Sequence, residues 1–245
     1  MNTQALSQEL ENHNAIKTLE SFGQKLKNTK FTKKQLNIFF GTLWAFFREI
    51  PTGILSLSLK ITDDWMENYN EWEGTAIAAP VLYANVDEYG IQSDISLKPT
   101  HHQLFKNLVK ILGINENDLL LQENILDDGL KFGKTTREYY RNRSIAEGVG
   151  FHLSSELTSS LEFQHFFDGF KAYAEYYNLV GNTQSALSFF TIHTQVEPLH
   201  LELGKKVANT YIEKMPRIKD QIFDGAIVFM DGFDRMFKEF NNKLF

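Results

Sequence analysis

The sequence contains no cysteine, although it is 245 residues long. This absence excludes disulfide bonds, thiolate nucleophiles, iron–sulfur clusters and cysteine-type zinc sites. Any metal ion must therefore be held by the 7 histidines and the 31 acidic residues. Imidazole and carboxylate ligands suit iron, manganese or catalytic zinc.

The chain also lacks a basic patch and a long hydrophobic run. Its formal net charge is −6, and the lysines and arginines are scattered, which argues against a nucleic-acid partner. No stretch has the length and apolar character of a membrane span, and residues 1–20 lack the apolar core of a signal peptide. We therefore expect a cytoplasmic protein with neither a nucleic-acid nor a membrane partner.

Prolines and strand-like runs are scarce as well. Only 5 prolines interrupt the chain, and the 21 phenylalanines recur with other apolar residues at helical spacing. We predict an all-α fold of about seven main helices, in one domain covering residues 1–245. Capping boxes predict helix starts at Thr32 and Thr135, and Thr100 is a predicted N-cap. The expected helical segments are 14–27, 32–50, 52–61, 63–90 with a kink at Pro80, 101–113, 136–161, 162–179, 185–215 and 216–240.

One helical stripe carries groups that can bind a metal. On a helix, His193, Glu197 and His200 lie at i, i+4 and i+7, so two imidazoles and a carboxylate face the same way. Composition alone predicts this spacing only about 0.02 times in such a chain. The flanking Phe189 and Phe190 indicate a buried helix, where these polar groups would be costly without a compensating partner. The alternative is a solvated polar face.

Other helices offer the remaining ligands. Glu88 ends one predicted helix and His101 begins the next, so the loop between them could bring the two side chains together. Glu156 lies in the middle of a helix, where a buried carboxylate needs a positive partner. Together with the stripe, these residues supply three carboxylates and three imidazoles, a set suited to two iron ions in a helical bundle.

The order of these motifs resembles the heme-oxygenase-like diiron oxidases and oxygenases, an iron-containing redox enzyme family. The resemblance rests on residues 85–90, on His101 with Leu104 and Phe105, on Glu156, and on the helical stripe of His193, Glu197 and His200. It extends over nearly the whole chain. It implies a compact seven-helix bundle with a weakly held pair of ferrous ions that activate dioxygen. By position it implies the following six metal ligands: Glu88, His101, Glu156, His193, Glu197 and His200. Manganese is the alternative metal.

The chain departs from the family pattern at several points. Pro198 follows Glu197 and would remove a backbone hydrogen bond inside the helix. His102 is adjacent to His101 and remains an alternative ligand. Glu147 and His152 are alternatives on the helix of Glu156. His152 lies four residues before Glu156, on the same face, and could instead donate a hydrogen bond to a ligand.

The resemblance predicts an oxygen-dependent non-heme diiron oxidase or oxygenase that oxidises or cleaves a small organic molecule. An external electron donor and a homodimer are both compatible with the sequence. The alternative function is a metal-free helical protein that binds a partner, or a cofactor-independent relative of the same fold. A descendant without metal is expected to lose several of the six ligand positions, and here all six are filled.

Overall fold

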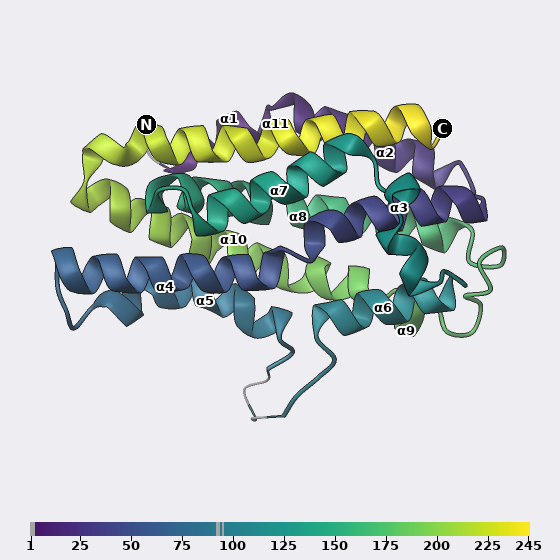
Figure 1. Ribbon diagram of the computed structural model, residues 1–245, viewed down its shortest axis with the longest axis horizontal. Coiled ribbons are helices and arrows are strands. Elements are labelled where there is room, and N and C mark those ends of the chain that lie inside the picture. Colours follow the sequence, from purple (N-terminus) through teal and green to yellow (C-terminus); the bar gives the residue numbers. More distant parts are fainter. Residues whose placement is uncertain (1–2, 92–93, 95) are drawn as a thin grey trace.

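The computed structural model describes residues 3–91, 94 and 96–245, and these form an all-α protein (Figure 1). The β-type pairing within these ranges is one isolated antiparallel bridge between Ile91 and Leu97. The α-helices are α1 (Thr3–Glu11), α2 (Asn14–Lys27), α3 (Lys33–Phe47), α4 (Ile50–Asn68), α5 (Gly74–Glu88), α6 (His101–Ile111), α7 (Asp127–Arg141), α8 (Ile145–Ala172), α9 (Thr183–Ala186), α10 (Ser188–Lys214) and α11 (Lys219–Lys243). Short 3₁₀ helices are η1 (Glu116–Leu120), η2 (Gln122–Asn124) and η3 (Pro216–Ile218).

Helix α8 is the centre of the bundle. It packs against α10 on one side and α11 and α2 on the other, and Figure 1 shows it between these layers. Phenylalanines fill the interface with α11, where Phe229, Phe233, Phe237 and Phe240 are buried. Burying each such ring stabilises the fold by roughly 1.5–3 kcal/mol, so the core holds the helices that carry the polar site in fixed positions.

Several predicted helix starts are confirmed. Thr32 and Gln35 form a reciprocal capping box, and so do Thr100 and Gln103 at the start of α6. Pro216 opens η3, from which α11 continues, as expected for a residue that lacks an N–H group. These starts are determined by side chains within one turn of the chain, which is why the sequence predicts them.

Other predicted boundaries are wrong, and the described residues contain more helices than the seven expected. The helix start expected at residue 63 is wrong, because Asp63 and Asp64 lie inside α4. Segment 63–90 is divided between α4 and α5, where the Asn70 side chain accepts a hydrogen bond from the Trp72 N–H and forms a turn. Pro80 lies inside α5.

The second half of the chain shows a similar correction. Thr135 lies within α7, which begins earlier because the Asp128 N–H donates to the distant Glu239 carboxylate at 2.8 Å. Ser144 and Glu147 form the capping box that starts α8. That helix then continues through the predicted break at 161/162, because no glycine or proline interrupts it there and both sides are packed in the core. Glu147, one of the alternative ligands, therefore has a capping role.

The loop between α5 and α6 brings two site residues together. Gly90 has φ +67° and accepts a hydrogen bond from the Lys98 N–H at 2.8 Å. A Cβ atom on Gly90 would lie 2.3 Å from the Lys98 carbonyl oxygen, so glycine is required there. The Ile91–Leu97 bridge extends this closure. As a result, the end of α5 and the start of α6 are held next to each other.

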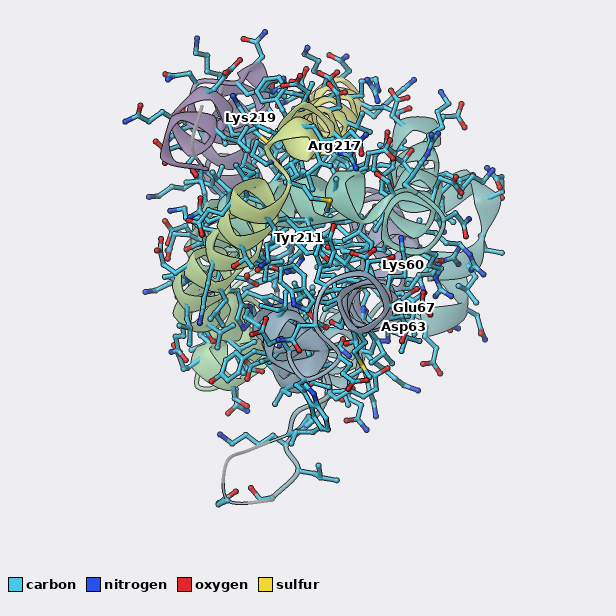
Figure 2. All side chains as sticks on the ribbon, turned by 90° about the vertical axis from the view of Figure 1, so that its left-hand side faces the viewer. Lys60, Asp63, Glu67, Tyr211, Arg217 and Lys219 are labelled. Carbon is cyan, nitrogen blue, oxygen red and sulfur yellow. The ribbon has the colours of Figure 1, made fainter. Side chains whose placement is uncertain are left out.

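Tyr211 on α10 contacts α4 at one end of the bundle. Figure 2 shows this residue between the helices, with Lys60, Asp63 and Glu67 on α4 and Arg217 and Lys219 at the turn into α11. The Tyr211 hydroxyl donates to Asp64 at 3.4 Å, and its ring packs edge-on against Trp65 with centroids 5.5 Å apart. These contacts join α10 to α4.

Candidate metal centre

The six residues predicted as ligands form two groups of three. Within each group, one possible ligand atom from every residue lies within 4.8 Å of the others. We call Glu88, His101 and His193 the Glu88 group, and Glu156, Glu197 and His200 the Glu156 group. The sequence predicts the stripe on α10, but the structure shows that its residues are shared between two groups rather than one.

The Glu88 group contains histidine nitrogens without hydrogen bonds. His101 Nδ1 lies 3.0 Å from Glu88 Oε1, in an orientation that forms no hydrogen bond, and His101 Nε2 has no partner either. The His101 and His193 rings are 4.3 Å apart between centroids. Burial lowers the pKa of His101, and the Glu88 carboxylate offsets this so that the pKa is raised overall. Buried polar atoms without partners are unusual, and a metal ion would satisfy one of these two nitrogens.

His193 is held in one tautomer. Its Nδ1 lies 2.6 Å from the Phe189 carbonyl oxygen, which can only accept, so Nδ1 carries the proton. Its ring stacks on Phe163 at a centroid distance of 3.8 Å. Burial and the nearby His101 hold the pKa of His193 well below its usual value, so the ring is neutral. The lone pair on Nε2 is therefore left for a metal.

In the Glu156 group, His200 is held by carboxylates on both sides. Its Nε2 lies 2.8 Å from Asp87 Oδ2, while Nδ1 lies 3.4 Å from Glu197 and 3.6 Å from Glu156. Burial alone would lower the pKa of His200, but these contacts, with Asp87 first, raise it to about 12. Asp87 was not predicted as a site residue. The available signal was its position next to Glu88 at the end of α5.

Glu197 Oε2 lies 3.4 Å from His200 Nδ1, and the residue is almost fully buried. Burial, followed by the neighbouring Glu156 carboxylate, raises the pKa of Glu197 to about 8. Its Oε2 makes no hydrogen bond. Pro198 lies inside α10, which remains helical on both sides of it, and the i, i+4, i+7 register of the stripe is kept.

His152 lies beside Glu156, as its position one turn earlier predicts. Its Nδ1 is 3.3 Å from Glu156 Oε1 and 3.1 Å from the Tyr140 hydroxyl oxygen. Burial lowers the pKa of His152 to about 3, so the ring is neutral. Tyr140 is fully buried, and the sequence did not single it out. His102 is in neither group, because its ring lies edge-on against Trp44, 4.8 Å away between centroids.

Glu162 is a further buried carboxyl group that the sequence analysis missed. It is 2% exposed, faces the same cavity as the two groups, and belongs to neither. Its Oε1 has no hydrogen-bond partner. Burial and the charge on Glu197 hold its pKa well above the usual range of a carboxyl group. His165 follows Glu162 at i+3, which is a possible ligand spacing, but His165 neither lines the cavity nor belongs to either group.

Both groups line one cavity of about 40 Å³. Its other walls include the rings of Phe47, Phe105, Phe163 and Phe189. A water molecule needs about 10–15 Å³ measured in this way, so the cavity has room for metal ions and a few small ligands only. The donor set of imidazole and carboxylate, and the atoms without partners, fit iron.

Comparison with known proteins shows the family of the chain. Residues 62–233 match the sequence model of a family described as iron-containing redox enzymes, and all six predicted ligands lie within this range. The chain belongs to that family. None of the curated proteins matches the chain.

Solved structures support the fold assignment. The chain resembles a crystal structure from Shewanella denitrificans OS217, described as a domain of unknown function with a heme oxygenase-like fold. The TM-score is 0.66 at 10% sequence identity, and the match covers 99% of this chain and 93% of the other. The predicted heme-oxygenase-like fold is therefore confirmed.

Among the residues that the structure describes, no helix has a stretch both long and apolar enough to cross a membrane.

Proposed function

We propose that this member of the iron-containing redox enzymes is a non-heme diiron oxidase or oxygenase, which uses dioxygen to oxidise or cleave a small organic molecule. The observation that carries the proposal is the pairing of two His-and-carboxylate groups on the walls of one cavity. Two ferrous ions bound there would supply the electrons that reduce dioxygen. Manganese is the alternative metal, and an external donor would restore the reduced state.

The protein's own residues have defined tasks in this proposal. Glu88, His101 and His193 hold one ion, and Glu156, Glu197 and His200 hold the other. Asp87 accepts a hydrogen bond from the Nε2–H of His200, which directs Nδ1 toward the site. Phe163 and Phe189 exclude water around His193. Glu162 holds a proton on its carboxyl group inside the cavity.

A ferrous titration under anaerobic conditions tests the proposal. We expect two ferrous ions to bind per chain and a new optical absorption to develop once oxygen is admitted. Binding of two ions without any spectral change in oxygen would contradict oxygen activation. Failure to bind ferrous ion at large excess would reject the diiron centre and favour a metal-free binding protein. The small-molecule substrate, the electron donor and a homodimer remain predictions.

A further inference from the structure

A second, larger pocket adjoins the metal cavity from the outside. It has a volume of about 330 Å³ and is formed by α3, α6 and η1, which lie near one another in Figure 1. Its apolar lining includes Trp44, His102, Phe105, Val109, Leu119 and Leu120. We call it the apolar surface pocket. Its volume lies at the lower end of the range typical of small-molecule sites.

Three aromatic side chains separate this pocket from the metal cavity. Trp44, His102 and Phe105 line both spaces. Trp44 stacks on Phe105 with centroids 5.3 Å apart and meets His102 edge-on at 4.8 Å. Because the metal cavity is only about 40 Å³, an organic substrate cannot lie wholly inside it. The apolar surface pocket is a space that shares its wall.

The lining indicates what kind of molecule would bind. Val109 and Leu119 are buried beneath the pocket, while Leu120 is 58% exposed at its mouth. The charged side chains of the lining, Lys106 and Glu116, pair with each other at 2.7 Å. Both side chains are mostly exposed, at 62% and 56%, so these two charges lie toward solvent, and most of the lining is hydrocarbon or aromatic ring.

We propose that the apolar surface pocket binds the substrate, an uncharged and largely apolar or aromatic small molecule, with its reactive part toward the partition of Trp44, His102 and Phe105. This inference rests on the proposed oxidase or oxygenase function. It gives His102 a role in the wall between substrate and metal, in place of the ligand role that its position next to His101 suggested.

Two fluorescent probes that differ by one charge test the ligand class. N-phenyl-1-naphthylamine is neutral, and 8-anilinonaphthalene-1-sulfonate is a similar molecule with an added anionic sulfonate. We expect the metal-free protein to bind one molecule of N-phenyl-1-naphthylamine per chain. It should bind the sulfonate at least tenfold more weakly. Binding should quench tryptophan emission in the wild type and do so less in Trp44→Phe. Equal affinities, or a preference for the sulfonate, would reject the uncharged class.

Leu120→Arg and Leu121→Arg locate the probe. Both residues are exposed, at 58% and 45%, so neither substitution should unfold the protein, but only Leu120 lines the pocket. We expect Leu120→Arg to weaken binding of the neutral probe at least tenfold and Leu121→Arg to leave it unchanged. Equal effects of the two variants would place the probe elsewhere and overturn the proposal.

Iron titration of the same variants separates this inference from the proposed function. Leu120→Arg should bind ferrous ion like the wild type, because Leu120 lies outside the metal cavity. Probe binding without iron binding would leave the pocket in place and reject the diiron function. Iron binding without specific probe binding would leave the diiron function in place and reject the apolar surface pocket as the substrate site.

Discussion

Glu162 is a carboxyl group buried in the same cavity as the two ligand groups, and it lies outside both of them. Burial and the charge on Glu197 raise its pKa, so the folded protein holds a proton that the unfolded chain would release at neutral pH. The unfolded state then binds fewer protons, and this residue makes the protein less stable as pH rises above the ordinary carboxyl pKa.

We predict that Glu162→Gln removes this pH dependence. Relative to the variant, the free energy of unfolding of the wild type should fall as pH rises from 5 to 8, by at most about 1.4 kcal/mol per pH unit. Chemical denaturation of both proteins in the presence of a chelator measures the difference. An infrared band of a protonated carboxyl group should also be present in the wild type and absent from the variant. Parallel stability curves would show that Glu162 is ionised.

The stripe on α10 gives a second prediction at the scale of single residues. Glu197→Ala removes a carboxyl ligand from the Glu156 group, so affinity for ferrous ion should fall about tenfold or more. Glu202→Ala is the matched control, because Glu202 is exposed and pairs with Lys205 at 2.8 Å. Anaerobic titrations and circular dichroism of both variants give the comparison. Equal losses would show that the stripe is not the ligand face.

At the scale of elements, the site depends on where helices end as much as on which faces they present. Glu88 is the last residue of α5 and His101 the first of α6, and the turn at Gly90 holds these two ends together. The capping box of Thr100 then fixes the first turn in which His101 lies. A change in this loop should therefore weaken metal binding more than it destabilises the core.

Gly90→Ala tests this dependence, with Gly113→Ala as its control. Both glycines have positive φ, at +67° and +69°, so both substitutions cost about 1–2 kcal/mol of backbone strain. Only at Gly90 would the new Cβ meet another atom, the Lys98 carbonyl oxygen, whereas nothing lies within 4 Å at Gly113. We expect Gly90→Ala alone to weaken ferrous binding. Similar ferrous affinities in the two variants would contradict the role of this loop.

At the scale of the whole molecule, the bundle buries many ionisable groups close together. In the metal-free protein, protons compete with a metal ion for the same ligand atoms. The pKa of His200 is raised to about 12 and that of Glu197 to about 8, so protons occupy ligand atoms at neutral pH. A metal ion must displace these protons in order to bind. The Phe-rich core supplies the rigid, dry surroundings that make the pKa shifts large.

Metal binding should therefore release protons and strengthen as pH rises. Between pH 6 and 8 we expect the affinity for ferrous or manganous ion to increase by about tenfold per pH unit for each proton released. Calorimetry in buffers with different ionisation enthalpies counts these protons directly. An affinity that does not change with pH would show that His200 and Glu197 are already deprotonated, or that neither binds the metal.

Much of the site is predictable because it depends on short-range order. The absence of cysteine restricts the ligands to imidazole and carboxylate, and the helical period places His193, Glu197 and His200 on one stripe. His152 reaches Glu156 for the same reason, since residues four apart on a helix are neighbours. Capping boxes at Thr32 and Thr100 involve side chains within a single turn.

Only the tertiary structure decided how the stripe is divided, because each group takes residues from separate helices. It selected His101 over His102 through the way α6 packs on α10 and Trp44. The contact of Asp87 with His200 and the burial of Glu162 were likewise decided between helices. No local period encodes the distance between side chains on different helices; that distance is set by the packing of the aromatic core.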